Sequence, residues 1–318
     1  MSKMIGLDEV YAARKVISKH LKPTPLVYSR SLSRELESDV YVKLENLNPT
    51  NSFKVRGGIY YMSIMHDRAG GFITASMGNH AQSIAFAGGL YGLDVRVVMP
   101  DWVSPVKKQA VEELGAEVIT YGKYYDESAA YAKKLADRQG LVYVDPINEK
   151  LLYPGVATMH LEVIEELPDV QLVFNPLGGG SGAIGAVTVY KTVKPSTKVF
   201  AVQAEGAPAF YQSYVEGRLV STDGVKTRAE GLAVAKAYQT PFELLRGRLD
   251  GVVLVSDEEM ERAVAKLFYT VRQVAELAGA ASTAAAYKLG LKGLKTVLML
   301  TGSNIQPGHL AEILSKHT

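Results

Sequence analysis

The stretch VFNPLGGGSGAIG, residues 173–185, indicates the fold class of this chain. It begins inside a short apolar run, Val170–Asn175, that is typical of a buried strand. Glycines and a serine follow, and small apolar residues then suit the first turns of a helix. Glycines in such a turn let several backbone N–H groups point at one anion, and the helix N-terminus adds positive potential. The stretch therefore predicts an α/β fold with an anion site, and a close-packed turn without a ligand is the alternative.

Strand-like runs and helical patterns alternate along the rest of the chain. Eight more short runs, rich in β-branched residues and bounded by Gly, Pro or Asp, are expected to be strands: Val40–Leu44, Gly71–Ala75, Val95–Pro100, Glu117–Tyr121, Leu141–Val144, Val199–Gln203, Val252–Val255 and Thr296–Leu300. Helical patterns lie between them, as at His80–Tyr91, Pro105–Leu114 and Asp257–Ala278. This alternation predicts mainly parallel sheets with helices on both faces. Because nine strands are many for one open sheet, we expect two α/β domains, a small one over residues 51–147 and a large one made of residues 1–50 and 148–318.

Composition and charge exclude several classes of function. The 318 residues are 47% hydrophobic, and a net charge of +2 gives no strong field for nucleic acid or a membrane surface. The chain has no cysteine, which rules out disulfides, thiolate nucleophiles and cysteine metal sites. No apolar stretch reaches the about 18 residues of a membrane span. Asp8 and Glu9 make a signal peptide unexpected, so we expect a cytoplasmic protein.

Lys54 is the first candidate for chemistry. It follows Ser52 and Phe53 and precedes a segment with two glycines, Gly57 and Gly58. A lysine that condenses with an aldehyde must be neutral for part of its cycle, and burial or a nearby cation lowers its pKa towards that state. A solvated helix lysine is the ordinary alternative, so the case for chemistry depends on the rest of the chain.

Three further clusters accompany the segment Asn51–Lys54. They are Ser76–Gln82, Gly178–Gly185 and Thr301–Asn304, and they lie at or just beyond the ends of predicted strands. Ligands of open parallel sheets bind at the carboxyl ends of strands. We therefore expect the four clusters to lie close together around one ligand.

A dinucleotide site is a rival interpretation of the glycine run. Gly180, Gly182 and Gly185 match the spacing of the dinucleotide fingerprint, and Glu205 lies near the position of its acidic residue. This makes a nicotinamide-dependent oxidoreductase a second hypothesis. The fingerprint lies past the midpoint of the chain, however, and leaves the other three clusters unexplained. One phosphate in the glycine run together with a distant Schiff-base lysine needs a single cofactor, pyridoxal phosphate.

The clusters belong to a longer series of motifs: Pro23-Thr24-Pro25-Leu26, Glu45-Asn46-Leu47, Ser52-Phe53-Lys54-x-Arg56-Gly57-Gly58, Gly78-Asn79-His80-Ala81-Gln82, the glycine run, Glu205–Pro208, Ala229–Val234, Ala278–Ala281 and Thr301–Asn304. In this order, they make the chain resemble the threonine dehydratase and serine racemase group of the fold-type II pyridoxal-phosphate enzymes. The resemblance covers nearly all of the chain. It implies two open, mainly parallel α/β domains like those of the tryptophan synthase β subunit, pyridoxal 5′-phosphate as the cofactor, and a homo-oligomer, a dimer or tetramer.

The resemblance also implies roles for individual residues. Lys54 would be the catalytic lysine that carries the cofactor, Phe53 would pack against the cofactor ring, Asn79 would bond the 3′ oxygen, and Thr301 would face the pyridine nitrogen. The phosphate would be held by Gly178, Gly179, Gly180, Ser181 and Gly182. The substrate carboxylate would be held by donors from Ser76, Met77, Gly78 and His80.

The implied reaction removes water from L-threonine, L-serine or both and yields a 2-oxo acid and ammonia. Lys54 would remove the Cα proton, and a neutral Thr301 opposite the pyridine nitrogen would disfavour transamination. A reaction of the threonine synthase or serine racemase type is an alternative, since Thr301-Gly302-Ser303 is similar to the threonine synthases. A binding protein with an inactive site is a third hypothesis.

Several positions depart from the family pattern. The position of Met77 resembles the one that holds a serine in the related serine racemases, where that serine acts as the second acid or base. A methionine cannot take that part, so we expect no racemisation by that route. Glu205 matches one ligand of a family cation site, but Tyr211 replaces an aspartate, so we expect no metal to bind there. No C-terminal regulatory domain is expected either.

Five other residues have both a functional and a structural interpretation. Arg56 and Arg228 suit a phosphate or carboxylate, although structural roles are favoured for both. Glu276 could lie at the edge of the cofactor or bond within its own helix, and His80 could orient a carboxylate or cap its helix. Trp102 is expected to be a core or interface residue.

Overall fold

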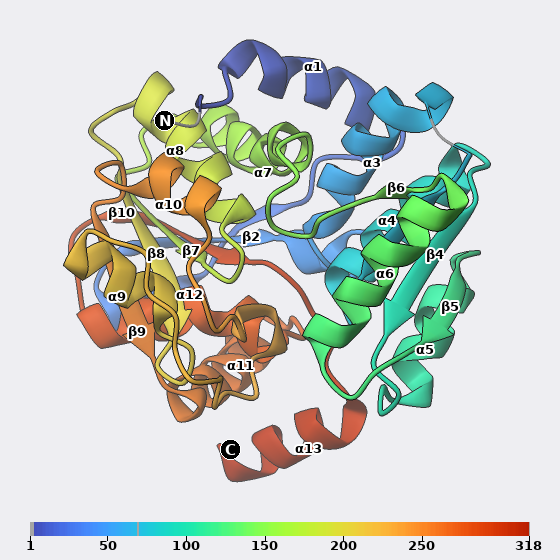
Figure 1. Ribbon diagram of the computed structural model, residues 1–318. Coiled ribbons are helices and arrows are strands. Elements are labelled where there is room, and N and C mark those ends of the chain that lie inside the picture. The colour runs from blue at the N-terminus through green and yellow to red at the C-terminus, as the bar shows by residue number, and fades with distance from the viewer. Residues whose placement is uncertain (1–2, 69, 318) are drawn as a thin grey trace.

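The computed structural model describes residues 3–68 and 70–317, so residues 1–2 and 318 of the predicted large domain lie outside it. The described residues form two sheets (Figure 1). The larger has the strand order β1-β2-β10-β7-β8-β9, with β1 Leu26–Tyr28, β2 Asp39–Leu44, β7 Leu172–Pro176, β8 Lys198–Ala204, β9 Gly251–Val255 and β10 Lys295–Leu300. The smaller has the order β5-β4-β3-β6, with β3 Phe72–Ala75, β4 Val95–Met99, β5 Glu117–Thr120 and β6 Val142–Tyr143. Pairing is parallel throughout except between β1 and β2.

Helices cover the sheets on both sides (Figure 1). Their bounds are α1 Leu7–Ile17, α2 Arg30–Leu36, α3 Lys54–Met65, α4 Asn79–Leu90, α5 Pro105–Glu112, α6 Tyr125–Gln139, α7 Leu152–Glu166, α8 Ser181–Val193, α9 Ala209–Glu216, α10 Gln239–Leu245, α11 Asp257–Val271, α12 Leu277–Leu289 and α13 Pro307–Lys316. Short 3-10 turns are η1 Glu45–Leu47, η2 His66–Arg68 and η3 Glu230–Leu232. The predicted α/β class is therefore confirmed.

Alternation along the strands separates two hydrophobic cores in the larger sheet. Val173 of β7 belongs to the core that α1, α7 and α8 cover. Its neighbours Leu172 and Phe174 point the other way, into the core that α11 and α12 cover. Successive side chains of a strand face opposite sides of the sheet. A strand whose two faces are both covered therefore needs apolar residues at successive positions.

The nine predicted strands are all present, and the sequence patterns missed β1, a three-residue edge strand. The predicted helix Asp257–Ala278 is wrong as one element. It ends at Val271, Arg272 takes the left-handed conformation with φ of 59°, and a new helix begins at Leu277. The amide of Asn46 bonds Gln273 and the carbonyl of Val274, which satisfies part of this irregular segment.

Helix α3 lies where the two sheets meet, since it packs against both α4 and α7. The strands of the smaller sheet all fall between Phe72 and Tyr143. The predicted domain limits at residues 51 and 147 stay a prediction, because they concern which parts move together. Within the described residues, no helix combines the length and the apolar character needed to cross a membrane.

Candidate active site

Two segments from opposite ends of the chain meet at the ends of the strands. Ser52 pairs with Gly302 in an antiparallel bridge, the N–H of Phe53 donates to the Thr301 carbonyl at 3.1 Å, and the N–H of Ser303 donates to the Asn51 carbonyl at 2.9 Å. These bonds bring the clusters Asn51–Lys54 and Thr301–Asn304 side by side. Thr301 itself is buried.

Lys54 begins helix α3 and is partly buried. Its Nζ lies 5.3 Å from the centroid of the Phe53 ring. Desolvation lowers the pKa of the Lys54 ammonium group to about 8, as the sequence predicts for a lysine that must become neutral. The hydroxyl of Ser83 donates to the Lys54 carbonyl at 2.6 Å and ties the start of α3 to helix α4. The site thus contains an amine that can give up its proton near neutral pH.

The glycine run forms a tight loop, the glycine cradle, in which any larger residue would clash with neighbouring parts of the protein. A Cβ at Gly178 would lie 2.1 Å from the Gly231 carbonyl oxygen, and one at Gly182 would lie 2.7 Å from the Asn175 amide nitrogen. Gly180 has φ of +100°, which L side chains rarely adopt. Ser181 then begins helix α8, whose first N–H groups lack partners within the helix. This geometry fits a phosphate group.

His160 contacts the glycine cradle from helix α7, and the sequence patterns did not identify this residue. Its Nε2–H donates to the Gly182 carbonyl at 3.0 Å, and its ring meets Tyr190 edge-on. Burial lowers the pKa of His160 to about 3, so the ring is neutral. A buried histidine on α7 has no signature of its own, since only the fold brings it beneath the loop.

The segment from Ser76 to His80 leads into helix α4. Ser76, Met77 and Gly78 are partly buried, and the N–H of Gly78 donates to the Ser76 hydroxyl at 3.3 Å. The side chain of His80 points inward, where its ring bonds the Thr74 hydroxyl at 3.1 Å. Burial, and then the charge of Lys54, lower the pKa of His80 to about 3. His80 can therefore offer a substrate its backbone N–H but not a charged side chain.

Asn79 connects this segment to the other side of the site. Its Nδ2 donates to Glu276 Oε1 at 2.7 Å, and its Oδ1 accepts from the side chain of Asn304 at 2.6 Å. Asn304 also donates to the Thr50 carbonyl at 3.0 Å. The helix break before α12 places Glu276 here, which is why the sequence left its role open.

An ion pair also spans the two sheets, and the sequence patterns did not identify it. The ammonium group of Lys107 on α5 contacts the carboxylate of Glu230 at the start of η3. The next residue, Gly231, lies against the glycine cradle. The ion pair therefore joins the smaller sheet to the part of the chain that borders the predicted phosphate site.

The other candidates have structural surroundings. Arg56 is fully buried and bonds Glu45 and Glu162, and Arg228 bonds Glu261 and Glu312. Trp102 is 63% exposed, so the expectation that it lies in the core is wrong, and an interface stays a prediction.

The predicted loss of the family cation site also stays a prediction. The carboxylate of Glu205 at the end of β8 pairs with Lys288 at 2.8 Å, and Lys288 also bonds Glu259. The backbone N–H of Tyr211 donates to the side chain of Gln203 at 2.9 Å. A cation at Glu205 would therefore have to compete with an ammonium group.

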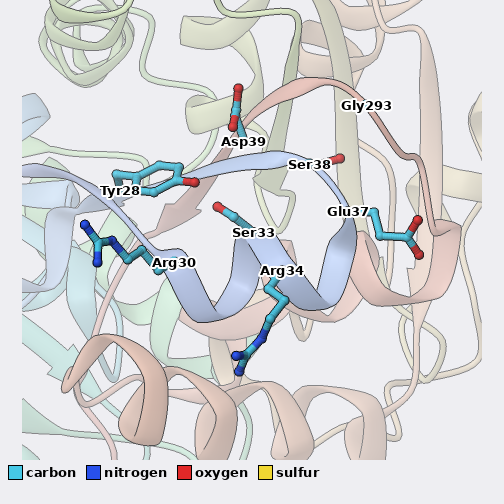
Figure 2. A pocket seen from close by; sticks show the side chains of 8 residues that line it. All are labelled: Tyr28, Arg30, Ser33, Arg34, Glu37, Ser38, Asp39 and Gly293. Carbon is cyan, nitrogen blue, oxygen red and sulfur yellow. The ribbon is translucent and has the colours of Figure 1, made fainter.

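A hollow of about 580 Å³ lies at another place, between β1, α2 and the turn at Gly293 (Figure 2). Tyr28, Arg30 and Arg34 line it together with Glu37 and Asp39, and Figure 2 shows several of these side chains pointing away from one another. None of the predicted site residues lines it. The convergence of reactive groups, rather than the size of a hollow, therefore identifies the candidate active site.

Comparisons with known proteins agree with this geometry. The sequence pattern of the family described as pyridoxal-phosphate dependent enzyme matches residues 17–302. The L-threonine ammonia-lyase of Thermotoga maritima is 36% identical, over 98% of this chain and 79% of its own length. The processed form of threonine deaminase isoform 2 from Solanum lycopersicum is 31% identical with a TM-score of 0.90, over 98% of this chain and 90% of its own. Maize serine racemase has a TM-score of 0.93 at 24% identity, over 99% and 98%, which is a likeness of fold.

Proposed function

This chain belongs to the pyridoxal-phosphate dependent enzymes, and we propose that it converts L-threonine, L-serine or both to the corresponding 2-oxo acid and ammonia. The reaction removes the β-hydroxyl and the Cα proton as water, and hydrolysis of the remaining enamine releases ammonia. The relatives named above for threonine support this substrate class.

The observation that carries the proposal is the environment of Lys54. Its amine has a pKa lowered to about 8 by desolvation and lies 5.3 Å from the Phe53 ring centroid, and the bridge between Ser52 and Gly302 holds the backbone of this segment. The glycine cradle fits a phosphate group, because Gly180 turns the backbone through a positive φ into the start of helix α8, whose first N–H groups have no partners within the helix. Together these residues suit a cofactor that has one aldehyde and one phosphate.

We assign each residue a task in the reaction. When bound, pyridoxal phosphate supplies an electron sink for negative charge at the substrate Cα. Lys54 Nζ takes the Cα proton, because a lysine with a lowered pKa can act as a base near neutral pH. Ser76 and the backbone N–H groups of Gly78 and His80 hold the substrate carboxylate.

Domain closure is part of the proposal. The small domain over residues 51–147 would move towards the rest of the chain when substrate binds, which would exclude water from the proton-transfer step. The ion pair between Lys107 and Glu230 and the bond between Asn79 and Glu276 support this, because each joins the two sides.

Racemisation is the second candidate reaction, and Met77 counts against it. A thioether cannot deliver a proton to the face of Cα opposite Lys54. We therefore expect L-serine to give pyruvate and no D-serine. Chiral chromatography of the reaction mixture measures both products, and D-serine at a rate comparable to pyruvate would contradict this assignment.

The main test is a panel of amino acids assayed for release of 2-oxo acid and ammonia by the purified protein loaded with pyridoxal phosphate. We expect turnover of L-threonine or L-serine, and no turnover by Lys54→Ala. Borohydride reduction followed by peptide mass spectrometry should place the cofactor on Lys54.

Matched measurements separate the alternatives. Lys108→Ala, at a partly exposed lysine of α5 that pairs with Glu112, should retain full activity. A protein that binds NADH saturably and takes up no pyridoxal phosphate would instead favour the nicotinamide hypothesis. Cofactor uptake without turnover of any β-hydroxy amino acid would leave only a binding function.

A further inference from the structure

We propose that Glu276 is a positioning residue that fixes the orientation of the Asn79 side-chain amide towards the cofactor. The proposal rests on the proposed function, since it assigns Asn79 to the cofactor. It adds a residue outside the lysine, glycine and carboxylate-binding segments.

The hydrogen bonds of Asn79 determine where the oxygen and the nitrogen of its side-chain amide lie. Oδ1 accepts from Asn304 Nδ2 at 2.6 Å, and Nδ2 donates to Glu276 Oε1 at 2.7 Å. A carboxylate can only accept and an amide nitrogen can only donate, so Glu276 forbids the flipped orientation. One N–H of Nδ2 then has no acceptor among the described residues, and it is available to the 3′ oxygen of the cofactor.

The surroundings hold the Glu276 carboxylate in this place. A Cβ at Gly302 would lie 2.5 Å from Glu276 Oε1 and 3.3 Å from Asn79 Nδ2, so only glycine leaves room for the contact. The backbone N–H of Glu276 donates to the Gly302 carbonyl at 3.1 Å. Gly302 in turn pairs with Ser52, two residues before Lys54. The carboxylate and the reactive lysine are therefore fixed to the same short segment.

The charges around Glu276 come from both sides of the site. Burial raises the pKa of Glu276 to about 7, the hydrogen bond from Asn79 lowers it, Glu230 raises it and Lys107 lowers it. Near pH 8 the carboxylate is ionised, which makes it the strongest available acceptor for the Asn79 amide. Glu276 should therefore hold the Asn79 amide most firmly at mildly alkaline pH.

Cofactor affinity tests the proposal through a double-mutant cycle. We would titrate the full-length protein, stripped of cofactor, with pyridoxal phosphate at pH 8 and record the quenching of protein fluorescence and the absorbance of the bound cofactor. Glu276→Leu should weaken binding about tenfold, the equivalent of one hydrogen bond, and shift the absorbance band. The same change in an Asn79→Ala background should alter affinity by less than about twofold, because the group it positions is gone.

Two further variants keep the result interpretable. Glu276→Gln preserves the acceptor oxygen and should recover most of the affinity, and Glu258→Leu, at an exposed position of α11, should leave affinity unchanged. If Glu276→Leu does not fold, Asn304→Leu removes the other partner of Asn79 and must show the same dependence on Asn79. Equal losses in both backgrounds, or no loss, would overturn the proposal. Failure of the wild type to bind pyridoxal phosphate would instead refute the proposed function.

Discussion

A lysine amine reacts with an aldehyde only after it loses its proton, so under the proposed function the pKa of Lys54 decides when this chain can take up its cofactor. The sequence predicted the residue and the direction of its pKa shift from an aromatic neighbour and a glycine-rich segment. It could not predict the role that we propose for Glu276. The contact of this residue with Asn79 depends on a helix break that has no glycine or proline to mark it, and on the close approach of Gly302.

The lowered pKa of Lys54 predicts a pH dependence for cofactor uptake. The cofactor-free protein should take up pyridoxal phosphate about tenfold faster for each pH unit up to about 8 and at a constant rate above it, because the neutral fraction of the amine rises in this way. Samples quenched with borohydride at successive times give the rate. A midpoint near the ordinary lysine value of 10.5 would show that Lys54 is solvated.

Helix α3 is held in place by a buried group of four charges. Arg56 bonds Glu45 at 2.7 Å and Glu162 at 2.6 Å, and Lys43 bonds Glu162 at 2.6 Å, so two cations balance two carboxylates. Because Arg56 lies two residues after Lys54, this group anchors the Lys54 end of α3 to β2, η1 and α7. Burial alone would raise the pKa of Glu45, but the charge of Arg56 lowers it well below the usual range.

Arg56→Met should destabilise the protein by about 3–5 kcal/mol, the cost of leaving a buried charge without its partner. Urea unfolding at pH 8 measures it. The loss should shrink as the pH falls towards 5, since the abandoned carboxylate of Glu45 can then take up a proton. Arg262→Met removes an exposed pair with Glu258 and should cost no more than about 0.5 kcal/mol. Similar losses for the two variants would show that the buried group is not an anchor.

Helices and strands with a clear pattern of apolar residues could be predicted from the sequence. Those whose limits depend on contacts with distant parts of the chain could not. Strands such as β7 and β10 carry mostly apolar runs because both faces of the larger sheet are covered, and such runs are visible in a sequence. Strand β1 has three residues at a sheet edge, which is too short for a pattern. The break between α11 and α12 contains neither glycine nor proline, and Asn46 from a distant turn stabilises it.

At the scale of the whole molecule, the described residues form two sheets with their covering helices, and the ion pair between Lys107 of α5 and Glu230 of η3 joins the two parts. Glu230 is 65% exposed at its side chain, so this pair is weak in free-energy terms. A weak contact would suit the proposed domain closure, because the domains must separate again to release product.

Lys107→Met and Glu230→Gln should each raise the KM for the amino acid up to about fivefold, consistent with a pair worth less than about 1 kcal/mol. The double variant should be no worse than either single one, and the coupling should fade in 1 M salt. Steady-state kinetics at two salt concentrations provide the measurement. Lys108→Met, which affects only a pair within α5, should leave KM unchanged. If the effects of the two substitutions on KM were additive and independent of salt, Lys107 and Glu230 would not act as a pair in domain closure.

The contact between α5 and η3 has a practical consequence, because this chain carries no thiol of its own. Cysteines introduced at Lys107 and Glu230 would be the sole attachment points for a pair of fluorescent dyes, so no background labelling would need to be removed. Energy transfer between the dyes would then follow the opening and closing of single molecules during turnover.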